Sequence, residues 1–164
     1  MQSKTAADSY SVLTHWSGVA DLNGLGTVHG GVILKLIDEA AAIAASRHCR
    51  TACVTGGFDR VSFLTPVRAG ELVTMTAVLT AVWKTSMEVA VRVEAESPRG
   101  PERRHTCTAY VTMVAVDDEG HPSRVPGLEA TTPLEQRRMR EAQLRRENRL
   151  AERAQIELER RSEP

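Results

Sequence analysis

The sequence has little of several features that mark common classes of protein. Its 164 residues carry 21 basic and 21 acidic side chains, so no excess charge favours a nucleic-acid partner. No apolar run approaches the length that crosses a bilayer, and no apolar leader follows the N-terminal lysine, which predicts a cytoplasmic chain with no membrane partner. The three cysteines, Cys49, Cys53 and Cys107, form no Cys-x-x-Cys pair and are expected to be free thiols.

Several cofactor and catalytic motifs are also missing. Gly24-x-Gly26 begins like a dinucleotide-binding turn, but His29 stands where the third glycine is required. The sequence has no Gly-x-Ser-x-Gly elbow and no His-Glu-x-x-His pair, and its five histidines are scattered. We therefore expect neither a serine-hydrolase triad nor a metal, and no redox cofactor.

What the chain does have is a glycine-rich turn that leads into a long apolar stretch. Residues 24 to 31 contain four glycines, and the next seventeen residues contain no glycine or proline, which predicts one long buried helix. Gly30 and Gly31 lie where this helix begins. Because the first N–H groups of a helix lack intrahelical partners, these two residues suit the stabilisation of an oxyanion.

The remainder of the first 125 residues is strand-like. A strand with one wet face is predicted over residues 87–95, where polar residues alternate with Met87, Val89, Val91, Val93 and Ala95. Further strands are expected at residues 10–16, 52–64 with a break at Gly56-Gly57, 72–82 and 106–116. Their short connections favour antiparallel pairing. The predicted fold class is α+β: a long central helix wrapped by a curved antiparallel sheet, whose uncovered edges favour a dimer or larger assembly.

Composition divides the chain into three segments. Residues 1–9 are expected to be a flexible N-terminus, residues 10–125 the folded domain, and residues 126–164 a linker followed by a charged C-terminal helix that begins at Thr132-Pro133. The apolar set in this helix is thin, Leu144, Ala151 and Leu158, so a solvated helix is predicted.

The main chemical candidate is Asp38, a carboxylate on an otherwise apolar helix. Partial burial would make it a better general base or nucleophile, whereas an ion pair with Lys35 one turn earlier is the structural alternative. Asn23 could position a water or a carbonyl, or only form a turn. His29 could line the glycine loop or cap the helix.

An ordered set of short motifs resembles those of the hotdog-fold acyl-CoA thioesterases, the acyl-CoA hydrolase family. The set covers residues 10 to 125 and comprises Asn23-Gly24, His29-Gly30-Gly31, Asp38-Glu39-Ala40, Arg47-His48, Val54-Thr55, Val61-Ser62-Phe63, Pro66-Val67, Gly70-Glu71 and Thr85-Ser86-Met87-Glu88-Val89. The resemblance implies a double-hotdog homodimer, commonly assembled as a trimer of dimers. It also implies that Asp38 is catalytic and that Asn23 reaches it from the partner subunit. The chain departs from the family pattern at Trp83-Lys84, where Gly-Arg is frequent.

Together these observations lead to the hypothesis of acyl-CoA hydrolysis between two subunits. Asp38 would act as base or nucleophile and Asn23 would orient water or the thioester, while Gly30 and Gly31, with His29 beside them, would hold the oxyanion. Arg60, Lys84, Thr85 and Ser86 are the candidates for binding coenzyme A. A non-catalytic acyl-CoA sensor is the alternative, and a hotdog hydratase, which would leave the thioester intact, is a third reading.

Overall fold

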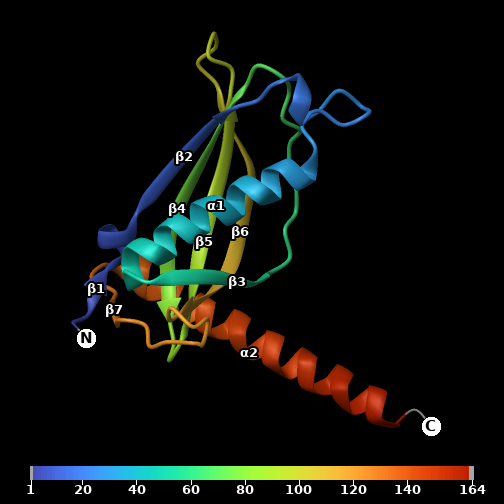
Figure 1. Ribbon diagram of the computed structural model, residues 1–164. Coiled ribbons are helices and arrows are strands. Elements are labelled where there is room, and N and C mark those ends of the chain that lie inside the picture. Colours follow the sequence, from blue (N-terminus) through green and yellow to red (C-terminus); the bar gives the residue numbers. More distant parts are fainter. Residues whose placement is uncertain (1, 163–164) are drawn as a thin grey trace.

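A computed structural model describes residues 2–162 and shows one curved sheet between two helices (Figure 1). The five main strands lie in the order β2-β4-β5-β6-β3, and every neighbouring pair is antiparallel. The elements in chain order are β1 (Lys4–Thr5), a 3₁₀ turn η1 (Ala6–Ser9), β2 (Ser11–Trp16), η2 (Val19–Asp21), α1 (Gly30–Cys49), β3 (Ala52–Phe58), β4 (Leu72–Val82), β5 (Ser86–Glu96), β6 (Arg103–Val116), β7 (Leu128–Glu129) and α2 (Pro133–Ser162). The expected hotdog architecture is confirmed.

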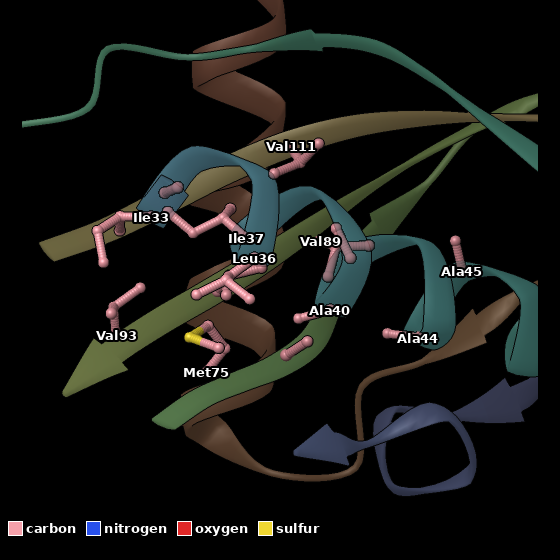
Figure 2. Packing of buried hydrophobic residues seen from close by; sticks show 14 of the residues in the cluster. Ile33, Leu36, Ile37, Ala40, Ala44, Ala45, Met75, Val89, Val93 and Val111 are labelled. Atoms are coloured by element: carbon pink, nitrogen blue, oxygen red, sulfur yellow. The ribbon is translucent and has the colours of Figure 1, made fainter. Parts of the chain in front are cut away.

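The core lies between α1 and the inner face of the sheet. Figure 2 shows Ile33, Ile37 and Ala40 of α1 facing strand residues that include Met75 and Val89. Small alanines along the buried stripe of α1 let the helix approach the sheet closely, and the alternating strand residues fill the remaining space. The helix ends at Arg50, whose φ of 60° is left-handed and whose N–H donates to the Ser46 carbonyl.

Strand β3 corrects one sequence prediction. The chain continues as a strand through Gly56-Gly57, with a register shift against β6 between Thr55 and Gly57, and residues 59–64 are not a strand. A Cβ at Gly56 would lie 3.3 Å from the Thr112 carbonyl oxygen. Glycine therefore allows the bulged backbone to stay close to β6 instead of breaking the strand.

The N-terminal segment expected to be flexible is attached to the fold at residues 4–9. Strand β1 pairs in parallel with β7, and Ala6 and Ser9 are buried. The Lys4 ammonium donates to the carbonyl oxygens of Arg47 and His48 in the last turn of α1. A cation at a helix C-terminus compensates the partial negative charge there.

Helix α2 lies on the opposite face of the sheet from α1 (Figure 1). Its start agrees with the sequence prediction, because Thr132 and Glu135 exchange capping hydrogen bonds around Pro133. The prediction of a solvated helix holds for its exposed end, residues 150–161, but Ala142 is fully buried against the body. Within residues 2–162, neither helix is both long enough and apolar enough to cross a membrane.

Candidate active site

The structure places Asp38 of α1 beside Thr55 of β3. The Thr55 hydroxyl donates a hydrogen bond of 2.5 Å to Asp38 Oδ1. Asp38 is on α1 and Thr55 is on β3, two elements that are in contact, and Asp38 is partly buried whereas Thr55 is exposed. A carboxylate held in this way has a fixed orientation while its second oxygen stays available for chemistry.

The structure also bears on the ion pair considered as the structural alternative for Asp38. Lys35 pairs with Glu39, at 3.8 Å between Nζ and Oε1, and both of these side chains are largely exposed. Lys35 therefore pairs with Glu39, the residue after Asp38, and not with Asp38 itself. The wet-edge pair proposed as the structural alternative for Asp38 is therefore wrong.

At the beginning of α1, His29 is the N-cap residue. Its Nδ1 accepts the Gly31 N–H at 2.9 Å, which leaves that donor already committed. A Cβ on Gly31 would lie 3.1 Å from His29 Nδ1, so glycine fits this tight cap. Among residues 2–162 the Gly30 N–H has no hydrogen-bond acceptor. Of the two glycines, Gly30 is therefore the one whose N–H is left to donate to a bound group.

A cavity of about 330 Å³ opens beside Gly30. Its walls are largely apolar and include Ile33, Phe63 and Val67. The Phe63 ring lies so close that a Cβ on Gly30 would be 3.5 Å from it. The space has the character of an apolar substrate pocket next to a free N–H group.

Asn23 is not in contact with Asp38 within one chain. Its Oδ1 accepts the Leu25 N–H at 2.9 Å, and its Nδ2 donates to Thr27 Oγ1 at 3.0 Å. The turn-forming role considered for Asn23 is therefore present in the structure. Gly30 and Asp38 are eight residues apart on one helix, about 12 Å at the α-helical rise, so one chain does not bring them to the same carbonyl group.

The residues considered for coenzyme A come from two places, the segment after β3 and the turn between β4 and β5. Ser86 is level with Val54 across the sheet, because Ser86 and Val54 both pair with Val114 of β6. Lys84, Thr85 and Ser86 form the hairpin turn between β4 and β5, where the Trp83 N–H donates to the Ser86 carbonyl oxygen at 2.7 Å. Arg60 follows β3 and lies 3.9 Å from Glu152 of α2, with 96% of its side chain exposed. Arg60 and the hairpin are on different elements, and each is close to α2.

The five-stranded sheet, its single inner helix and the Asp38–Thr55 pair define a hotdog-fold protein with a carboxylate site. Residues 25–102 match the family model described as "Thioesterase superfamily". The chain belongs to this superfamily.

Relatives and solved structures agree with this assignment. The mouse cytosolic acyl coenzyme A thioester hydrolase is 37% identical over 139 residues, which are 84% of this chain and 36% of that protein. The chain thus spans about a third of that relative's length. An apo-hexameric acyl-CoA thioesterase is 38% identical with a TM-score of 0.90, over 94% of this chain and 99% of that one.

A third relative has been solved with single residues replaced by alanine. The acyl-CoA hydrolase of Staphylococcus aureus, solved with butyryl coenzyme A, coenzyme A and coenzyme A disulfide, is 31% identical with a TM-score of 0.86, over 94% of both chains. Three further structures of that enzyme have alanine in place of an asparagine, an aspartate and a threonine. Those positions are separated by 15 and then 17 residues, as are Asn23, Asp38 and Thr55 here.

Thr55 is the site residue that the sequence analysis missed. It appeared there only as part of the Val54-Thr55 motif, because a threonine in a strand has no chemical signature of its own. Its meaning comes from the contact with Asp38, which is seventeen residues earlier and on another element.

Proposed function

We propose that the chain is an acyl-CoA thioesterase that hydrolyses acyl-CoA to a free acid and coenzyme A. The observation that carries the proposal is the Asp38–Thr55 hydrogen bond in a member of the thioesterase superfamily. The matching spacing of the three substituted residues in the S. aureus enzyme supports Asn23, Asp38 and Thr55 as the site. The reaction needs water and the thioester alone, without a metal or a redox cofactor.

In the proposed mechanism Asp38 acts in one of two ways. As a general base it takes a proton from the water that attacks the thioester carbonyl carbon; as a nucleophile it attacks that carbon itself and is regenerated by water. In both routes the C–S bond breaks and coenzyme A leaves as a thiol. The Thr55 hydroxyl holds one carboxylate oxygen, so the other is directed at the reaction.

We further propose that the site is completed by a second copy of the chain in a homodimer. If Gly30 is the oxyanion donor, its separation from Asp38 along α1 favours a donor from the partner subunit, and the lack of an Asn23–Asp38 hydrogen bond within residues 2–162 favours the same origin for Asn23. Strand β3 is an edge of the sheet, and Val54 and Phe58 on it and Ile43 on α1 are exposed. These features favour pairing along β3 and α1, and the hexameric relative supports a trimer of dimers.

For substrate binding, we propose that the acyl chain enters the apolar cavity beside Gly30 and that the coenzyme A portion reaches Arg60, Lys84, Thr85 and Ser86. The last four residues supply cations and hydroxyls, which suit phosphate groups. The name of the mouse relative supports a cytoplasmic location.

The test is release of free thiol from a panel of short to long acyl-CoAs. We expect turnover by the wild type, and a loss of about a hundredfold or more in kcat for Asp38→Ala and Asp38→Asn. Thr55→Ala should also slow turnover. Glu39→Gln is the matched control, because it removes the adjacent, solvent-exposed carboxylate and should leave kcat unchanged.

Near wild-type turnover by Asp38→Asn would contradict the mechanism. A folded protein that binds acyl-CoA without releasing thiol would instead identify the chain as a sensor.

A further inference from the structure

The outer face of the sheet carries a fully buried carboxylate at a position where the alternation of β5 predicts a wet residue. Glu88 has 0% of its side chain exposed. Arg145 of α2 binds it through Nη2 at 2.7 Å and Nε at 3.0 Å, and the Thr80 hydroxyl donates to it at 2.6 Å. Helix α2 therefore covers this face and supplies the counter-charge that burial of Glu88 demands.

A second pair extends the same contact to the end of β3. Arg149 lies one turn after Arg145 on α2, and its Nη1 donates to both carboxylate oxygens of Asp59, at 2.9 and 2.7 Å. The Arg145 guanidinium stacks on the Tyr110 ring, 3.6 Å from its centre. Two arginines on one face of α2 thus neutralise two acids on the sheet side.

Asp59 connects this cluster to the candidate active site. It directly follows β3, the edge strand that carries Thr55. Thr55 is four residues before Asp59 and donates its hydrogen bond to Asp38. The strand is bulged at Gly56 and is bonded to β6 along one side. Asp59 itself is bonded to β6 through its N–H and the Tyr110 carbonyl oxygen at 3.0 Å. The Arg149 contact fixes the side chain at the end of the segment that carries Thr55.

We propose that Arg149 is a positioning residue for thioester hydrolysis: by binding Asp59 it holds the bulged end of β3 in the register that places Thr55 on Asp38. The inference rests on the proposed function. It gives the middle of α2, residues 145–149, a role in the reaction, although α2 contributes none of the reacting groups. Arg145 and Glu88 fix α2 on the sheet, and Arg149 acts on β3 from that anchor.

Substitutions in the full-length chain test this role. In Arg149→Ala, Asp59 loses both hydrogen bonds from Nη1. We expect kcat to fall about tenfold while KM stays within about twofold, because a small displacement of a catalytic contact affects the chemical step. Asp59→Asn should have a similar effect, and the double variant should be no slower than either single one. Arg153→Ala is the matched control, since Arg153 is one turn further along α2, 76% exposed and paired with Glu157, and its kcat should not change.

Amide hydrogen exchange of residues 55–58 provides a readout apart from activity. We expect faster exchange there in Arg149→Ala than in Arg153→Ala, at temperatures well below either Tm. If the wild type is active and Arg149→Ala keeps the wild-type kcat, the inference is overturned and the proposed function stands. The same holds if the only effect of Arg149→Ala is a lower Tm. A wild type that releases no thiol would overturn both.

Discussion

His48 is a buried base whose surroundings oppose its protonation. The residue has no exposed surface; its Nε2–H donates to the Pro126 carbonyl oxygen at 2.9 Å, and among residues 2–162 its Nδ1 has no hydrogen-bond partner. Burial lowers the pKa of His48, and the nearby Lys4 ammonium lowers it further, while the Pro126 hydrogen bond and Asp8 act in the opposite direction. The folded protein thus keeps a neutral imidazole at a pH where the unfolded chain binds a proton.

This difference makes stability depend on pH. Because the folded pKa lies below the unfolded value of about 6.5, the contribution of His48 is complete above that value, starts to be lost as the pH falls below it, and is fully lost once the pH is below the folded pKa. We expect the free energy of unfolding to fall as the pH is lowered from about 6.5, with a contribution from this proton of at most about 1.4 kcal/mol per pH unit. Urea unfolding of His48→Gln, compared with the wild type, measures that contribution.

The control for this effect is His121→Gln, since His121 is largely exposed. It should keep the wild-type slope. An unchanged slope in His48→Gln would show that this histidine does not carry the pH dependence.

At the same scale, the sequence made Asp38 a candidate because a carboxylate stands out in an apolar helix. It could not identify the partner of that carboxylate, since Lys35 and Thr55 lie 3 and 17 residues away and only the folded chain selects between them. Glu88 shows the same limit. The alternation of β5 places it correctly on the outer face, but its burial depends on arginines 57 or more residues later in the chain.

At the scale of elements, the beginning of α1 depends on one side chain. His29 caps the helix through Nδ1, a less usual acceptor than a serine or aspartate oxygen. We expect His29→Ala to lower the free energy of unfolding by about 1 kcal/mol and His29→Ser to restore most of it. Urea unfolding measures both effects.

The same two variants separate the roles considered for His29. If capping is its only role, His29→Ser hydrolyses acyl-CoA like the wild type once the helix start is restored. A stable His29→Ser variant with strongly reduced kcat would instead assign the imidazole to the substrate site.

Elements with a long periodic pattern were predictable from sequence. Strand β4 has the bounds expected for it, and β5 extends one residue beyond them at each end, because alternating residues on a two-faced sheet leave a clear signal. Strands β1 and β7 were not predicted. Each has two residues, and their parallel pairing joins segments more than 120 residues apart, so neither has a periodic pattern.

At the scale of the whole molecule, the proposed dimer predicts that assembly and activity are lost together. Ile43 is 38% exposed on α1, five residues beyond Asp38. In Ile43→Glu a charge would enter the proposed interface, so we expect smaller particles in size-exclusion chromatography and a matching loss of thiol release. Leu158→Glu on the exposed end of α2 is the control and should change neither.

If Ile43→Glu dissociates into single subunits and is still fully active, one subunit is sufficient for the reaction. An intact assembly would show that Ile43 lies outside the interface.

The pairing of β1 with β7 also bears on how the chain is made. Residues 4 and 5 are synthesised long before their partners at residues 128 and 129, which appear only after the whole five-stranded sheet has been made. Closing so long a loop is slow compared with local folding. Strand β1 therefore remains unpaired until the five strands that separate it from β7 have been made, although Lys4 can already contact the end of α1.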